Sequence, residues 1–135
     1  MGKAVIYGSA KSDKSSTAEA EKQFQAGKEY AEIHQKEVFD YRFDISSSDQ
    51  TDQRPGLQAV LDMAAAGEVD TVIVSDLSKI SPSIAEVAKW LDKAKKSGAR
   101  VISRKGCGGD VFSPENQALA ACMRRFLPHE EKQRR

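Results

Sequence analysis

The sequence has almost no excess of charge of either sign and few cysteines, and both shortages exclude classes of protein. Its 21 lysines and arginines stand against 20 aspartates and glutamates, which gives a formal net charge of +1 at pH 7. This balance excludes a generally basic, histone-like binder, so any anion binding must come from local clusters. Cys107 and Cys122 lie fifteen residues apart without a CxxC or Cys/His spacing, which argues for reduced thiols and against a zinc site or a disulfide framework.

Long apolar runs are also missing. No run approaches the roughly 20 residues that a membrane span needs, and the first residues, MGKAVIY, enter a strand without a signal-peptide pattern. We therefore expect a cytoplasmic protein that does not contact a membrane and that holds neither a metal ion nor a cofactor. A chain of 135 residues suits a single domain.

What the sequence does contain is an alternation of short apolar runs with longer helical patterns, which is typical of βαβ units. The four apolar runs span residues 4–7, 38–43, 71–74 and 100–103. They predict an α/β fold of three layers, in which helices flank a mostly parallel sheet of four or five strands.

The first two predicted helices have recognisable ends. One begins near Ser16, where Glu19 three residues later completes a capping box, and ends before Val38. The next begins after Arg54, with a proline at the first helical position, and Gly67 closes it.

A third predicted helix begins at a second capping box, formed by Ser83 and Glu86, and stops at residues 97–98. Residues at helical spacing are expected to face the core in the three helices: Phe24, Tyr30, Ala31 and Ile33; Leu57, Val60, Leu61 and Ala64; Ile84, Val87, Ala88 and Leu91. Trp90 lies one position off the last of these stripes and is expected to be half-buried. Residues 106–109 predict a flexible turn, and a last helix is expected from Ser113 to about Leu127.

Ligand sites of open parallel sheets lie at the carboxyl ends of the strands, and three loops qualify: residues 8–16, 44–54 and 75–83. In the first, YGS is followed by lysine, serine and threonine, whose hydroxyls and backbone N–H groups can bind a phosphate at a helix start. The string is similar to the FMN-phosphate loop of flavodoxins, although it lacks that family's glycine-asparagine step. FMN or nucleotide-phosphate binding is therefore one hypothesis, and a solvated loop rich in turn formers is the other.

The other two loops favour a different family. Gln23, SSSDQTDQRPGLQAVL at residues 46–61 and GEVDTVIVSDLSKIS at residues 67–81 together resemble the catalytic domain of serine recombinases, the resolvase/invertase family. The resemblance runs from Ala4 to about Val111, with the motifs in the family's order and spacing. It implies a resolvase-like fold and a role in DNA recombination.

The residues that carry the family's chemistry are largely replaced. In that family the first strand ends in Y-x-R-x-S; Tyr7 matches the tyrosine, but Ser9 stands at the arginine and Lys11 at the nucleophilic serine. The family's third strand ends in L-D-R-L-G-R, and the aspartate and the two arginines of that motif are replaced by Ser78, Lys79 and Pro82. Arg54, within RPGL, is retained.

These replacements bear on phosphoryl transfer. Attack on a phosphodiester builds negative charge, which positioned guanidinium groups stabilise through forked N–H donors that a lysine lacks. Loss of one such donor typically costs on the order of a hundredfold to a thousandfold in rate. The resemblance therefore implies an inactive relative that is regulatory or associated with DNA. The alternative is an active recombinase fragment that uses Ser12, one residue beyond the expected position, as a displaced nucleophile.

Cations remain around the same cleft. Lys11, Lys14, Arg54 and Lys79 would surround it and could attract phosphate or DNA. The other interpretation is that they are solvated surface cations.

The C-terminal segment bears on assembly. We assign residues 1–112 to a resolvase-like catalytic-type domain and residues 113–135 to a helix with a basic tail. The apolar face of that helix consists of Ala118, Leu119, Cys122, Met123 and Phe126. Such a face predicts a partner, either a second copy of the chain in a homo-oligomer or an intact recombinase. Arg124 and Arg125 are candidate contacts to DNA phosphates.

Overall fold

The computed structural model describes residues 2–11, 16–46, 48–104 and 109–110. Its elements, in chain order, are β1 (Lys3–Ala10), α1 (Ser16–Ile33), β2 (Glu37–Ile45), the 3-10 helix η2 (Thr51–Gln53), α2 (Pro55–Ala65), β3 (Thr71–Val74), the 3-10 helix η3 (Leu77–Lys79), α3 (Ile84–Lys96), β4 (Arg100–Ser103) and β5 (Gly109–Asp110). All four strands and all three helices that the sequence predicts in this range are present.

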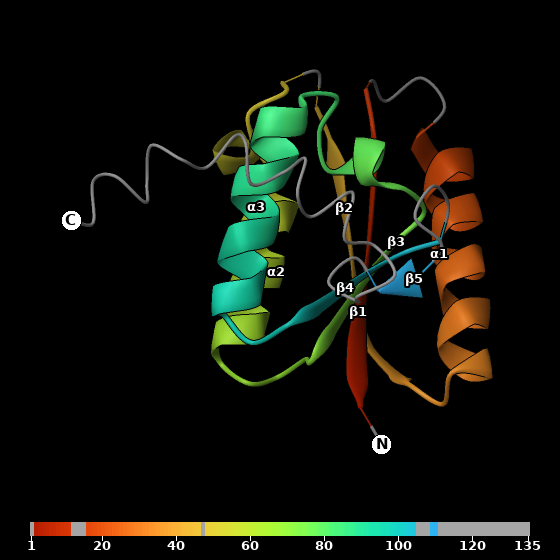
Figure 1. The fold of residues 1–135 in the computed structure, drawn as a ribbon. Helices are drawn as coiled ribbons and strands as arrows, with labels where there is room; N and C mark the ends of the chain where they lie inside the picture. Colours follow the sequence, from red (N-terminus) through yellow and green to blue (C-terminus); the bar gives the residue numbers. More distant parts are fainter. Residues whose placement is uncertain (1, 12–15, 47, 105–108, 111–135) are drawn as a thin grey trace.

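The strands form one sheet in the order β2-β1-β3-β4-β5. The first four are mutually parallel, and only the two-residue β5 runs antiparallel, beside β4. Helix α1 covers one face of the sheet, and α2 and α3 cover the other (Figure 1). The predicted three-layer α/β fold is therefore confirmed. Of the predicted turn at 106–109, residues 106–108 lie outside the described residues, and Gly109 belongs to β5, where it pairs with Ser103.

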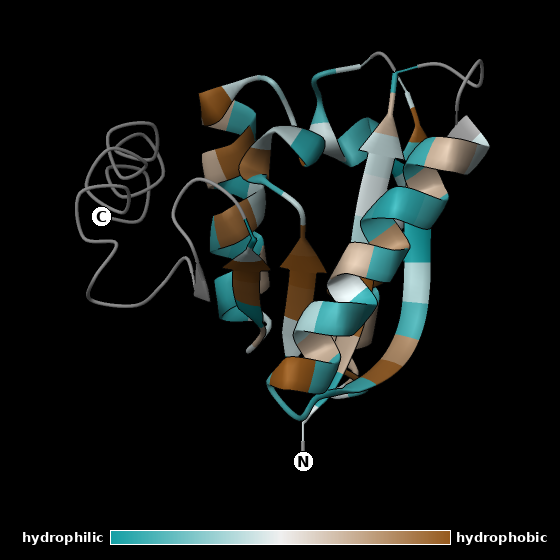
Figure 2. Cartoon of the chain, turned by 90° about the vertical axis from the view of Figure 1, so that its right-hand side faces the viewer, coloured by the Kyte–Doolittle hydropathy of each residue, from teal (hydrophilic) through white to brown (hydrophobic). Residues whose placement is uncertain are grey.

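The core lies on both faces of the sheet because alternate side chains of a strand point to opposite sides. Val5 and Tyr7 of β1 belong to the cluster packed beneath α2 and α3. Ala4 and Ile6 belong to the cluster beneath α1. Strand β3 is hydrophobic along most of its length and β4 in its middle, whereas α1 is largely hydrophilic (Figure 2).

The helix faces follow the predicted stripes except at three residues. Ile33 and Ile84 were expected in the core, but they are 76% and 56% exposed, and each is the terminal residue of its helix. Trp90 was expected to be half-buried and is fully buried. Its indole N–H donates to the carbonyl of Leu57 at 3.4 Å, which gives the polar atom of this large ring a partner between α2 and α3.

The helix ends agree with the predicted caps in most respects. Gly67 and Gly98 follow α2 and α3 with φ of +76° and +89°, a conformation in which a side chain is strained. The hydroxyl of Ser83 accepts from the Glu86 amide at 3.3 Å, as a capping box requires. The reciprocal half of that capping box is absent, because the Glu86 carboxylate binds Thr51 instead. The side chain of Ser16 lies outside the described residues, so its capping box stays a prediction.

The C-terminal segment that carries the expected last helix, residues 113–127, also lies outside the described residues, as do Arg124 and Arg125. Within the described ranges, no helix combines the length and the apolar character needed to cross a membrane.

Candidate functional site

The three loops chosen from the sequence meet at the carboxyl edge of the sheet, where β1, β2 and β3 end. In their described parts, hydrogen bonds join Ser9 and Arg54 to the backbone of Lys79, and a second set joins Asp44 to Tyr7 of β1. Ser9, Arg54 and Lys79 were expected here by their charge or by the resemblance. Asp44 was missed.

Ser9, at the expected arginine position, is held by hydrogen bonds to its hydroxyl, its amide and its carbonyl. It is 6% exposed, and its hydroxyl donates to the carbonyl of Lys79 at 2.6 Å. The side chain of Gln23, from α1, binds the backbone of Ser9: Oε1 accepts from the Ser9 amide and Nε2 donates to the Ser9 carbonyl, both at 3.0 Å. Gln23 therefore holds the end of β1 as a neighbouring strand would, and the Ser9 hydroxyl serves a structural contact.

Arg54 is buried, which corrects the interpretation that it is a solvated surface cation. It is 4% exposed, and its guanidinium donates to two backbone carbonyls. Nε and Nη2 donate to Ser48 at 3.2 and 2.8 Å, and Nη1 donates to Lys79 at 3.0 Å. Three of the five N–H donors of an arginine side chain are thus used within the chain itself.

The Lys79 carbonyl is the meeting point of this arrangement. It accepts from both Ser9 and Arg54, so η3 is held against the end of β1 and against the loop before α2. The Lys79 carbonyl oxygen therefore occupies the Ser9 hydroxyl donor and one N–H of the Arg54 guanidinium. The sequence pointed to the ammonium group of Lys79, and its backbone is the part that makes these contacts.

Asp44 occupies the centre of a second buried group. Its carboxylate accepts from the Tyr7 hydroxyl at 2.7 Å and from the amides of Gly56 and Leu57 at 2.8 and 3.2 Å. Two of the first amides of α2 are thereby satisfied by a residue eleven positions before that helix begins, because Arg54, at the N-cap, offers no capping side chain. A Cβ added at Gly56 would lie 2.7 Å from Asp44 Oδ2, so the glycine of RPGL makes room for this carboxylate.

Burial and the hydrogen bond to Asp44 raise the pKa of the Tyr7 phenol far above its usual value. Tyr7 therefore stays protonated and donates to Asp44; it does not act as a phenolate. The sequence signal that could have revealed Asp44 is its place as the last polar residue of β2 before the serine-rich loop.

The remaining candidates are less enclosed. Lys11 and Pro82 are exposed, and Lys79 is half-buried. Ser78, at the expected aspartate position, bonds through its amide and its hydroxyl to Asp76. Ser12 and Lys14 lie outside the described residues. Among the described side chains, no group of three or more histidines, cysteines, aspartates or glutamates is placed to hold a metal ion.

Comparison with known proteins identifies this arrangement of strands and loops. Residues 9–135 match the family model "Resolvase, N terminal domain". None of the curated proteins compared with the chain matches it significantly.

Solved structures agree on the fold. The N-terminal catalytic domain of TP901-1 integrase superposes with a TM-score of 0.79 at 20% identity, covering 98% of this chain and 99% of the other. A resolvase family site-specific recombinase from Streptococcus pneumoniae gives 0.73 at 17% identity, with 98% and 93% covered. The C-terminal catalytic domain of ISC1926 TnpA, an IS607-like serine recombinase, gives 0.68 at 21% identity, with 77% and 70% covered. Because the family model spans most of the sequence, this chain belongs to the resolvase N-terminal domain family of serine recombinases.

Proposed function

We propose that this resolvase-type domain does not cleave DNA and acts in recombination as a regulatory or DNA-associated relative. The observation that carries the proposal is the state of Arg54, the one basic residue retained from the family's set. It is buried, and its guanidinium is bonded to the carbonyls of Ser48 and Lys79.

The neighbouring positions support the same conclusion. Ser9 replaces an arginine and turns its hydroxyl to a backbone carbonyl, and Lys11 replaces the nucleophile. Lys79 and Pro82 replace two further arginines. A serine recombinase must stabilise the charge that develops on the phosphate oxygens, and electrostatic donors are usually the largest contribution to that step. With about three donors missing and the remaining guanidinium engaged, strand cleavage is expected to fall below detection.

A search for a covalent protein–DNA adduct tests this proposal. The full chain is incubated with supercoiled plasmid DNA and with nicked duplexes, then analysed on denaturing gels for an SDS-stable adduct and on agarose for relaxation. We expect neither. An adduct that disappears in Ser12→Ala and persists in Ser97→Ala, a control at the end of α3, would refute inactivity and establish the displaced nucleophile.

Association with DNA and with a partner completes the proposal. Lys11, Lys79, Arg124 and Arg125 are the residues we assign to phosphate contacts, and residues 113–135 to dimerisation or to binding an intact recombinase. Neutralising a phosphate contact should weaken binding to all duplex sequences alike and reduce its salt dependence. Fluorescence anisotropy at several salt concentrations measures the first effect, and light scattering measures the oligomeric state.

The family match argues against the flavodoxin-like alternative. Purified protein is expected to be colourless and to show no thermal shift with FMN.

A further inference from the structure

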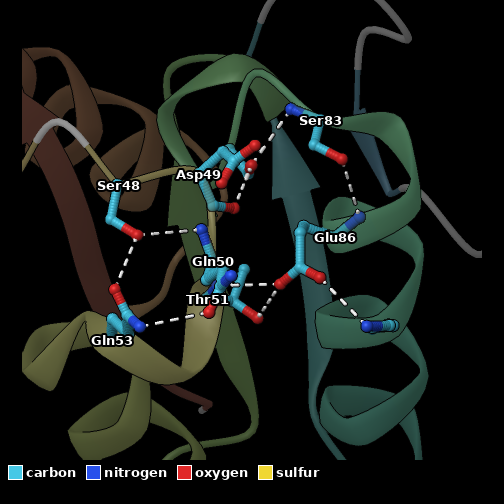
Figure 3. Close-up of polar contacts among 9 residues, drawn as sticks. Ser48, Asp49, Gln50, Thr51, Gln53, Ser83 and Glu86 are labelled. Carbon is cyan, nitrogen blue, oxygen red and sulfur yellow. Dashed lines mark hydrogen bonds and ion pairs between the residues drawn. The ribbon is translucent and has the colours of Figure 1, made fainter.

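The loop that carries Arg54 is fastened to the beginning of α3 by hydrogen bonds that the sequence did not predict (Figure 3). Oε1 of Glu86 accepts from the amide of Thr51 at 2.9 Å and from its hydroxyl at 3.3 Å. The hydroxyl of Ser81 donates to the carbonyl of Asp49 at 2.6 Å. Thr51 is 3% exposed, so its amide has little access to water as an alternative partner.

Glu86 can make this contact because another group satisfies the backbone at the start of α3. In a complete capping box the glutamate would accept from the amide of Ser83. Here that amide donates to the Ser81 hydroxyl at 3.0 Å. The second carboxylate oxygen of Glu86 pairs with Lys89 at 3.0 Å, which orients the group toward the loop.

We propose that Glu86 is a positioning residue: its carboxylate orders residues 48–54 and thereby holds the Arg54 guanidinium in the candidate site. The inference concerns the place of Arg54 and does not depend on whether the site cleaves DNA.

The path from Glu86 to Arg54 is short and continuous. The Thr51 carbonyl accepts from the amide of Arg54 at 3.2 Å and from the Gln58 side chain at 3.1 Å. On its other side, the loop continues to Ser48, whose carbonyl accepts from the guanidinium. A shift of Thr51 therefore moves both the residue that bears the guanidinium and one of the two carbonyls that bind it.

The carboxylate form of Glu86 makes the contact. The hydrogen bond from the Thr51 amide, assisted by Lys89, holds the pKa of the Glu86 carboxyl below its usual value of 4.5. Because the pKa is lowered, the hold on Thr51 is present at neutral pH and is lost as the pH falls through the Glu86 pKa. Three charged groups, Lys89 and Lys93 on α3 and Asp52 in η2, share a polar hollow of about 230 Å³ with Glu86. The next charged residue of the loop is Asp49, whose carbonyl accepts from Ser81.

NMR spectroscopy of the full chain tests the contact directly. In the wild type, the Thr51 amide proton should shift with pH, with a midpoint below 4.5. The shift should persist in Asp52→Asn, which removes the neighbouring carboxylate of the loop. It should vanish in Glu86→Gln, which keeps an acceptor oxygen but cannot titrate.

Hydrogen exchange tests the consequence for Arg54. Glu86→Ala removes the acceptor, so the Thr51 amide and the Arg54 Nε proton should exchange at least about tenfold faster. Glu86→Gln should restore most of the protection, and amides in the middle of α3 should be unchanged in both variants.

Two results would overturn the proposal: a Thr51 titration that survives in Glu86→Gln, or an Arg54 Nε proton whose exchange is the same in Glu86→Ala as in the wild type. If Glu86→Ala does not fold, the titration in Glu86→Gln decides alone. Neither readout depends on DNA binding, so a failure here is distinct from a failure of the proposed function.

Discussion

Replacing Asp44 should destabilise the domain more than replacing any exposed carboxylate. Asp44→Ala removes the acceptor of three donors, the Tyr7 hydroxyl and the amides of Gly56 and Leu57. A buried donor left without a partner costs about 1–3 kcal/mol, and loss of a negative charge at the start of α2 adds roughly 0.3–1 kcal/mol. We expect the free energy of unfolding to fall by about 3–5 kcal/mol, since some donors will be reached by water.

Chemical denaturation and calorimetry measure this loss. For a domain of 135 residues, about 3–5 kcal/mol corresponds to a fall in Tm of very roughly 12–20 °C. Asp44→Asn keeps one acceptor oxygen and should cost less than Asp44→Ala, and Tyr7→Phe, which removes a single donor, should cost least. Asp62→Asn, an exposed carboxylate on α2, is the matched control and should stay within about 0.5 kcal/mol of the wild type.

The order of these losses is the decisive result. If Asp44→Asn is as stable as the wild type, the carboxylate does not cap α2 and the reasoning is wrong. Equal losses for Asp44→Asn and Asp62→Asn would show that net charge, and not the buried contact, sets the stability.

Three further variants test individual features of the fold: the buried phenol of Tyr7, the buried ring of Trp90 and the positive φ of Gly67. The pKa of Tyr7 is raised in the folded state, so its contribution to stability is complete below the unfolded pKa of 10 and is lost as the pH rises above that value toward the folded pKa. The alkaline loss of stability should therefore be smaller in Tyr7→Phe, and denaturation at pH 8 to 11 measures it. Trp90→Ala should cost about 3–5 kcal/mol by leaving a cavity between α2 and α3, and a loss under 1 kcal/mol in denaturant titrations would contradict full burial. Gly67→Ala should cost about 1 kcal/mol because of the +76° φ, whereas Ala66→Gly beside it should cost less; thermal melts compare the two.

Much of the fold follows from local pattern. Short apolar runs bounded by turn residues predicted β1 to β4, and caps such as Pro55 and Gly67 predicted where α2 begins and ends. The apolar pattern alone does not predict exposure, which depends on neighbouring elements. Ile84 shares the spacing of the α3 stripe, yet it is the first residue of the helix and is exposed, whereas Val87 and Leu91 pack in the core. Trp90 was expected to be half-buried because it lies one position off the apolar stripe of α3. It is fully buried because α2 packs against this position.

The resemblance of RPGL and its neighbouring segments identified the family and marked Arg54 as the retained basic residue. It did not reveal that the guanidinium is buried or which atoms it binds. The same holds for Asp44 and Glu86, whose partners lie 37 and 35 residues away at Tyr7 and Thr51.

The sequence by itself determined the strands, the helices and the family of this protein, because apolar periodicity and capping act between residues a few positions apart. Only the tertiary structure decided the state of the candidate site. Whether Ser9, Arg54 and Glu86 face a ligand or the chain itself depends on how loops distant in sequence meet at the end of the sheet. In this fold Ser9 and Arg54 bind the backbone of Lys79, and Glu86 binds the backbone of Thr51.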